Sequence, residues 1–256
     1  MDKLKKFALV ALGLLTIATT FNACSDDDDD NGGYYWNAVP NALVTVKSDG
    51  DACYFQLDDK TTLKPGNINK KPFGDKEVRA LVNYSLTGQK DDKYGTVVYV
   101  NWIDSILTKK PVPCLATEKE NDEKYGNDAV DIVRDWVTVA EDGYLTLRFR
   151  TLWGGVKAHS INLVSGVNPE NPYEVELRHN TNGDPLLRWG DALVAFNLND
   201  ALPDTDGKTV KLTIKWKSTT GDKSVDFDYC SRAKTPATAN SLLLKGFVRE
   251  DNHVIK

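Results

Sequence analysis

Apolar and polar residues alternate with a period of two from Trp36 to Ile106. The segments NALVTVKSD and ACYFQLDD flank a turn, and EVRALVNYSLTG and GTVVYVNWIDSI follow, with the shorter piece TTLKPGN between the pairs. Such alternation is typical of half-buried strands. About five strands without a convincing helix predict a small barrel over residues 34–110, for which the OB type is the commonest solution, with a small SH3-like barrel as the alternative.

The alternation stops between Lys109 and Asp128. The stretch KKPVPCLATEKENDEKYGND carries two prolines and dense charge, without a hydrophobic period. Composition of this kind is typical of a boundary between domains. We therefore predict a linker at residues 111–128.

A second β pattern covers residues 129–232. VTVAEDGYLTLRFRTL predicts a hairpin with Glu141-Asp142-Gly143 at its tip, and TVKLTIKWKS and SVDFDYC predict two later strands. About seven short strands spaced by turns favour an immunoglobulin-like β-sandwich. The predicted fold class is all-β, a small N-terminal barrel followed by a C-terminal sandwich. We leave the tail at residues 233–256 without an assignment.

The N-terminus has the pattern of a secretory signal. Lys3, Lys5 and Lys6 precede the apolar stretch Phe7 to Thr20, which is too short for a comfortable bilayer span. FNAC resembles a bacterial lipobox, with Phe21 in place of the usual Leu. We predict a signal peptide at residues 1–23 and a lipid anchor on Cys24, because several acyl chains on one residue hold a protein firmly to a membrane.

An acidic run follows the cysteine directly. Packed like charges stay solvated, so this run predicts an extended tether over residues 24–33. The run also resembles the surface-export signal of Bacteroidota lipoproteins, so we expect the protein at the outer membrane, facing outward. The acidic run consists of Asp26, Asp27, Asp28, Asp29 and Asp30.

The charge of the rest of the chain argues against a nucleic-acid partner. The whole chain carries a net charge of −5, and the five aspartates account for as many negative charges. The remainder is close to neutral and lacks the basic field that nucleic-acid binding requires.

Catalytic motifs are absent from the sequence. It contains no GxSxG, HExxH, Walker A, GxGxxG or CxxC pattern. His159 begins a predicted strand and His179 ends one, which makes a paired polar site conceivable. Histidines at strand ends are usually hydrogen-bonded structural residues, so we expect both rings to be exposed or bonded to backbone, with no metal between them. We predict no catalytic residue, no metal and no cofactor.

Three further features are candidates for modification or ligand contact. Cys53 and Cys114 form a possible disulfide, with free buried cysteine as the alternative. Asp104-Ser105-Ile106 resembles a short O-glycosylation signal of the same bacteria, which makes Ser105 a candidate. Aromatic residues in loops can stack on sugars, although such residues more often pack; the candidates are Tyr34, Tyr35, Trp36 and Trp153.

Several longer stretches together resemble the NigD-like family of Bacteroidota lipoproteins. They are DWVTVAEDGYLTLRFRT, HSINLV, PYEVELRHNTNGD, TVKLTIKWKS and VDFDYCSR. The resemblance implies an N-terminal OB-type domain, a C-terminal β-sandwich and a bacteriocin-related role, as an immunity or accessory protein. We therefore expect a non-enzymatic module that binds a protein partner, with a glycan-binding accessory lipoprotein as the alternative.

Overall fold

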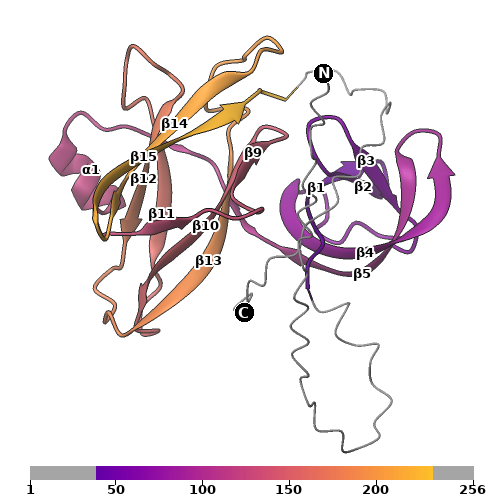
Figure 1. The fold of residues 1–256 in the computed structure, drawn as a ribbon, viewed down its shortest axis with the longest axis horizontal. Helices are drawn as coiled ribbons and strands as arrows, with labels where there is room; N and C mark the ends of the chain where they lie inside the picture. Colours follow the sequence, from indigo (N-terminus) through magenta and orange to yellow (C-terminus); the bar gives the residue numbers. More distant parts are fainter. Residues whose placement is uncertain (1–38, 233–256) are drawn as a thin grey trace, which may run out of the picture. The chain divides into compact units, whose positions relative to one another are not determined.

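The computed structural model describes residues 39–232. Two β-rich bodies make up this part of the chain, a barrel followed by a sandwich (Figure 1). The barrel strands are β1 (Ala42–Asp49), β2 (Ala52–Gln56), β3 (Thr62–Pro65), β4 (Val78–Asp91) and β5 (Gly95–Ser105).

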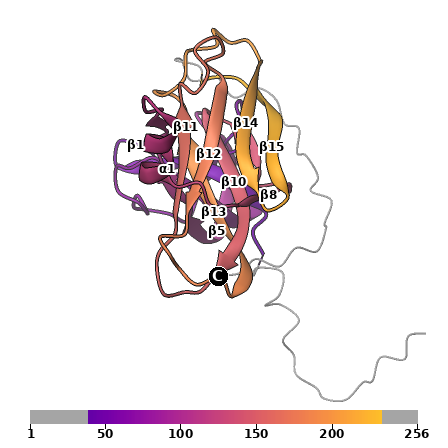
Figure 2. The ribbon, with the colours of Figure 1, turned by 90° about the vertical axis from the view of Figure 1, so that its left-hand side faces the viewer.

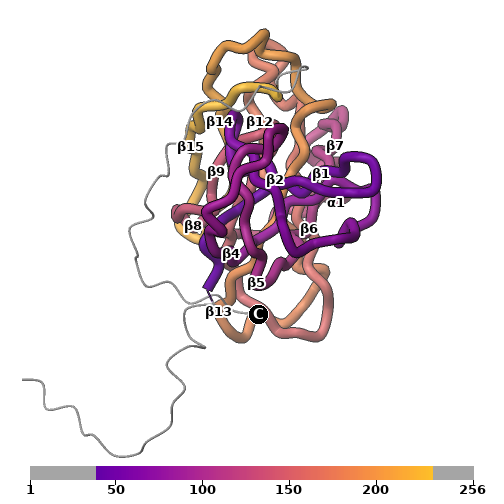
Figure 3. Tube along the Cα trace, turned by 90° about the vertical axis from the view of Figure 1, so that its right-hand side faces the viewer, coloured from indigo at the N-terminus to yellow at the C-terminus, as the bar shows by residue number. Residues whose placement is uncertain are grey.

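The barrel closes in the order β1-β2-β3-β5-β4, with β1 paired to both β2 and β4 (Figure 3). β3 and β5 run parallel, and the other pairs are antiparallel. This closed, five-stranded arrangement is an OB-type barrel, which decides between the two barrel types that the sequence left open. The interior is filled by the inward residues of the alternating pattern, among them Val44, Phe55, Val82 and Val98.

The sandwich has two sheets (Figure 2). The first contains β6 (Leu107–Lys109), β13 (Arg188–Asn197), β10 (Tyr144–Trp153), β8 (Asp131–Val133) and β9 (Val139–Glu141). The second contains β15 (Gly221–Tyr229), β14 (Val210–Ser218), β12 (Glu174–Asn180), β11 (Ser160–Ser165) and β7 (Val112–Pro113).

The predicted hairpin is present as β9 and β10, in which Tyr144 pairs with Glu141. The inward residues of β10 and β14 meet in one buried cluster between the two sheets. Each alternating strand therefore places its apolar face where the pattern puts it. This cluster includes Leu145, Leu147, Phe149, Leu212 and Ile214.

The predicted linker at residues 111–128 is wrong. Its first residues form β7, which pairs in parallel with β11, and Glu118–Tyr125 form the helix α1. Thr117 caps the helix in a reciprocal pair with Glu120, and the buried side chain of Arg178 forms ion pairs with Glu118 and Asp122. The segment is thus an integral part of the sandwich.

Barrel and sandwich meet without a spacer. Only Ile106 separates β5 from β6, and its buried side chain joins a cluster with residues of both bodies. The fully buried Arg79 of β4 donates to Glu141 of β9 at 2.7 Å. Arg79 also lies over the ring of Tyr144, whose hydroxyl donates to Glu77 at 2.6 Å. Charged and apolar contacts together fix this junction.

Candidate functional site

Two loops connect the sheets of the sandwich at one end. Residues 154–159 lead from β10 to β11, and residues 181–187 lead from β12 to β13 (Figure 2). The register of β10 and β13 brings the loops together, because Trp153 lies opposite Arg188. The sequence-predicted residues Trp153, His159 and His179 all lie in or next to these loops.

Asp184 ties one loop to the other. Its Oδ2 accepts from the backbone N–H groups of Gly154 at 2.6 Å and Gly155 at 3.0 Å, and its Oδ1 accepts from those of Val156 and Lys157, both at 2.8 Å. Burial of the carboxylate acts to raise its pKa, but the four N–H donors outweigh this and hold the pKa of Asp184 well below its usual range. Asp184 is therefore a carboxylate at neutral pH.

Glycine residues allow this close approach. A Cβ atom at Gly154 would lie 2.4 Å from the carbonyl oxygen of Pro185, so a side chain there would push the loops apart. Gly183 has a φ of 73°, a left-handed conformation that glycine adopts without strain. The turn Thr181-Asn182-Gly183 thereby directs Asp184 toward the other loop.

The two histidines continue from Asp184 in a chain of hydrogen bonds, the histidine cluster. His159 Nε2 lies 3.2 Å from Asp184 Oδ2, and His159 Nδ1 lies 2.9 Å from His179 Nε2. A carboxylate can only accept, so with His159 neutral its Nε2–H donates to Asp184 and its Nδ1 accepts from His179. Burial, reinforced by His159, lowers the pKa of His179, which favours its neutral form.

The environment of the histidine cluster is closed. The side chains of His159 and Asp184 are 2% and 0% exposed, and His179 is fully buried. The ring of Trp153 stacks on His159 with centroids 4.1 Å apart, and its Nε1 donates to the carbonyl of Gly190 at 2.9 Å. Trp153 is thus half-buried and packs in this structure.

The expectation that both histidines are exposed or bonded to backbone is wrong. The rings bond to each other and to a carboxylate, because the ends of β11 and β12 and the two loops converge. Their positions at strand ends were a usable signal. Asp184 gave none, since an aspartate in TNGDP has the pattern of an ordinary turn residue.

The histidine cluster has the Asp-His order of a catalytic triad, but a triad also needs a nucleophile. Asp184 and the nitrogens of His159 are used within the cluster, and His179 Nδ1 has no hydrogen-bond partner among the described residues. In the part of the chain that the structure describes, no serine, threonine or cysteine side chain bonds to either ring. The arrangement can hold two loops in place.

The other sequence-predicted residues lie apart from the histidine cluster. Cys53 belongs to the barrel core and Cys114 lies next to α1; both are free, so the structure contradicts the proposed disulfide. Ser105 is exposed at the end of β5, and its glycosylation stays a prediction. The remaining candidates, Cys24, Asp26 to Asp30, Tyr34, Tyr35 and Trp36, lie outside the described residues.

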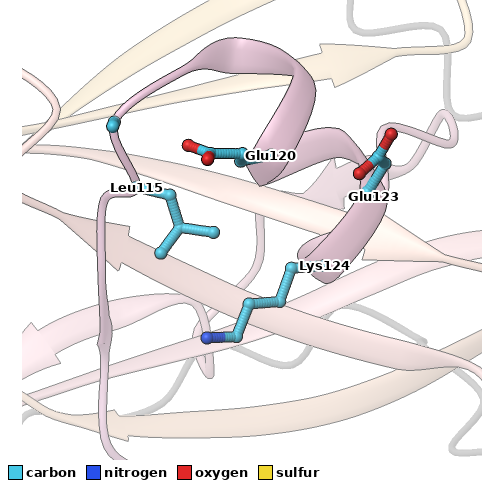
Figure 4. A pocket seen from close by; sticks show the side chains of 5 residues that line it. Leu115, Glu120, Glu123 and Lys124 are labelled. Atoms are coloured by element: carbon cyan, nitrogen blue, oxygen red, sulfur yellow. The ribbon is translucent and has the colours of Figure 1, made fainter.

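A shallow, open depression lies beside α1 (Figure 4). Its lining mixes acidic, basic and apolar groups, and none of the lining residues belongs to the histidine cluster. Over residues 39–232, no group of three histidine, cysteine or acidic side chains is arranged to hold a metal ion. Nor does this range contain a helix that is long and apolar enough to cross a bilayer. The depression is lined by Leu115, Ala116, Glu120, Glu123 and Lys124.

Two family models match the chain in succession. Residues 43–106 match the NigD-like N-terminal OB domain, and residues 113–229 match the NigD-like C-terminal β-sandwich domain. The chain belongs to the NigD-like family. Both the resemblance and the fold class predicted from the sequence are confirmed. No curated protein matches the chain.

Solved structures of similar proteins come from Parabacteroides and Bacteroides species. A toxin-related protein from Parabacteroides distasonis is 38% identical, with a TM-score of 0.62 over 74% of this chain and 92% of its own. A protein of unknown function from Bacteroides vulgatus is 23% identical, with a TM-score of 0.61 over 82% and 94%. A NigD-like immunity protein from Bacteroides caccae is 20% identical, with a TM-score of 0.51 over 72% and 90%. The last two show the shared fold.

Proposed function

We propose that this NigD-like protein is a lipoprotein of the outer membrane that faces outward and acts by binding a protein partner. Two sequence features support the location: the lipobox-like FNAC, which ends at Cys24, and the aspartate run that follows it. The names of two similar structures, an immunity protein and a toxin-related protein, support a bacteriocin or another envelope protein as the partner.

One observation carries the non-enzymatic part of the proposal. The best catalytic candidate in the described residues, the histidine cluster, is closed to solvent and bonded internally. Catalysis needs titratable groups that converge on a space where substrate can sit. Here the carboxylate instead accepts four backbone N–H groups, so its charge stabilises two loops.

The location is tested first with Cys24→Ala. The wild-type protein should stay in the membrane pellet after a carbonate wash, and the variant should lose this association because the acyl chains are its anchor. A matched control is Cys230→Ala, which removes a thiol from the far end of the described chain. Retention of the Cys24 variant in the pellet would contradict the lipid anchor.

The binding role is tested by cross-linking on intact cells, with the anchored protein as bait. We expect one envelope or bacteriocin protein to be enriched over a bait that was unfolded before capture. Enrichment of polysaccharide alone would contradict a protein partner and favour the glycan-binding alternative. Turnover of a cell-envelope substrate that disappears in a folded His159→Asn variant would contradict the non-enzymatic proposal.

A further inference from the structure

The two loops tied by Asp184 carry a concentration of exposed apolar side chains. Val156 is 73% exposed, Leu187 72%, Leu186 58% and Trp189 53%. Exposed apolar groups scattered singly are normal in proteins, but a contiguous group marks a contact site. We call this surface the loop tip, comprising Val156, Lys157, Leu186, Leu187, Arg188 and Trp189.

The apolar side chains of the loop tip are held outward. The four hydrogen bonds to Asp184 fix the backbone of residues 154–157, and Gly154 packs directly against Pro185. Trp189 lies within β13, opposite Leu152 of β10. A loop held in this way cannot fold its apolar groups into the core, so they remain available to a partner.

Charge indicates the kind of partner. The exposed charged residues of the loop tip are Lys157 and Arg188. The single acid in residues 153–158 and 181–189 is Asp184, which is buried and satisfied by backbone. The loop tip therefore exposes two positive charges on a chain whose net charge is −5, and these charges complement an anionic surface. Tryptophan and leucine next to basic residues are typical of protein segments that lie at a lipid–water interface.

The chain enters the fold at the same end. Residues 39–232 belong to one compact unit, and in Figures 1 and 2 the indigo start of β1 and the two sandwich loops lie at its lower end. Fourteen residues separate Cys24 from Val39. At about 3.3–3.6 Å per extended residue, a segment of this length reaches up to about 50 Å. An anchor at Cys24 is therefore long enough to let the loop tip touch the same bilayer.

We propose that the loop tip inserts into the headgroup region of a bilayer that carries anionic lipid. Trp189 and the leucines enter the interface, while Lys157 and Arg188 contact the headgroups. The placement next to a membrane rests on the proposed lipid anchor. Contact at this second point holds the sandwich against the bilayer, so the partner-binding surface lies elsewhere on the fold.

The test uses the full mature lipoprotein, reconstituted into vesicles of phosphatidylcholine and phosphatidylglycerol with brominated acyl chains. Bromine quenches tryptophan fluorescence at short range, so Trp189→Phe should remove most of the bromine-dependent quenching. The matched control is Trp136→Phe, which changes another exposed tryptophan, 40% exposed and outside the loop tip. This control should leave the quenching unchanged.

Lipid charge gives the second arm. We expect the quenching assigned to Trp189 to fall on pure phosphatidylcholine vesicles, and in the Lys157→Gln, Arg188→Gln double variant. Equal quenching on neutral and anionic vesicles would overturn the requirement for anionic headgroups. Equal quenching in the Trp189 and Trp136 variants would overturn insertion of the loop tip.

Vesicle flotation separates this proposal from the proposed anchor. Protein that floats with the vesicles is anchored, whatever the state of Trp189. If the protein floats but acrylamide quenches the fluorescence of Trp189 as strongly as in detergent, the proposal is overturned. The loop tip would then be assigned to a protein partner. Protein that does not float would contradict the lipid anchor itself.

Discussion

At the scale of single residues, one buried carboxylate organises the end of the sandwich. The carboxylate of Asp184 accepts hydrogen bonds from four backbone N–H groups and from His159. An amide side chain cannot accept as many, because only its oxygen is an acceptor. Between the same two loops, residues 154–159 and 181–187, Asn182 adds one bond, from its Nδ2 to the carbonyl of Ala158 at 2.7 Å. Asp184 makes four backbone bonds to the opposite loop, so the order of the loops depends mainly on Asp184.

We predict that Asp184→Asn loosens the loops. The substitution keeps the size of the side chain but removes the charge and one acceptor oxygen, and buried N–H groups without acceptors are unfavourable. Amides 154–157 should exchange with solvent faster, and the urea midpoint of unfolding should fall. The control is Asp222→Asn at an exposed position of β15, and unchanged exchange at residues 154–157 in the Asp184 variant would contradict the prediction.

His179 gives the folded state a dependence on pH. Burial lowers its folded pKa, so the unfolded chain takes up the proton first as the pH falls. Neutral His179 makes its full contribution to the free energy of unfolding above the pKa of the unfolded state, about 6.5. This contribution is lost as the pH falls from that value through the lowered pKa of the folded state. Over that window the free energy of unfolding should fall by up to about 1.4 kcal/mol per pH unit.

Urea unfolding at pH 7.5 and pH 5.5 measures this effect. The difference between the two pH values should shrink in His179→Gln, because glutamine does not titrate. His253→Gln changes a histidine outside the described residues and should leave the difference unchanged. An equal pH dependence in all three proteins would show that His179 is not its source.

At the scale of elements, α1 shows where the sequence was insufficient. Its sequence EKENDEKY is polar all round, so no apolar period marks it as a helix. Its stability comes from the Thr117–Glu120 capping pair and from Arg178, a strand residue that lies more than fifty positions later. Contacts of that separation cannot be found in a local pattern. β6 and β7 are missed for the same reason, since each has two or three residues and pairs only with distant strands.

Elements with a strong local pattern were predictable. The β9–β10 hairpin and strand β14 bury the residues that the alternation selects. The histidine cluster was only half predictable, because strand ends indicated the two rings but nothing indicated Asp184. Its position follows from the turn at Asn182 and Gly183, whose backbone directs the side chain across to the other loop.

We predict that Arg178→Gln releases α1 from the sandwich. The side chain of Arg178 is 2% exposed and its guanidinium donates to Asp122 at 2.7 Å, so its loss removes the ion pairs that join β12 to Asp122 and Glu118 of α1. Trypsin should then cut at Lys119 or Lys124 at least about tenfold faster than in wild type, because local opening becomes easier. Arg150→Gln, at a half-exposed position on the other sheet, should keep the wild-type rate. Equal cleavage of both variants would contradict this role of Arg178.

At the scale of the whole molecule, the junction between barrel and sandwich depends on buried charge. Arg79 is fully buried and bonds to Thr45 of the barrel and to Glu141 and Thr146 of the sandwich. Burial raises the pKa of Glu141, and Arg79 counteracts this. A buried charge without its partner is much less favourable than the pair, so the junction should be sensitive to loss of the arginine.

We predict that Arg79→Met lowers the free energy of unfolding by about 3–5 kcal/mol. The control, Lys211→Met, breaks an exposed ion pair with Asp228 and should change the free energy of unfolding by about 0–1 kcal/mol. Urea unfolding followed by tryptophan fluorescence measures both values. A loss below about 1 kcal/mol in the Arg79 variant would show that Glu141 finds another partner or reaches solvent.

The acidic tether determines which side of the membrane the whole molecule faces, if the aspartate run is an export signal. We predict that replacing Asp26 to Asp30 with asparagine leaves the protein in the membrane fraction, since Cys24 is intact, but protects it from proteinase K added to intact cells. The charge-matched control replaces five exposed aspartates of the folded part: Asp51, Asp92, Asp200, Asp206 and Asp222.

The control should stay sensitive to the protease on intact cells, because its tether is unchanged. Protection of both variants would show that total charge, and not the position of the run next to Cys24, governs export. Sensitivity of the tether variant would leave the run with the single role of a solvated spacer, since like charges repel and keep the chain extended.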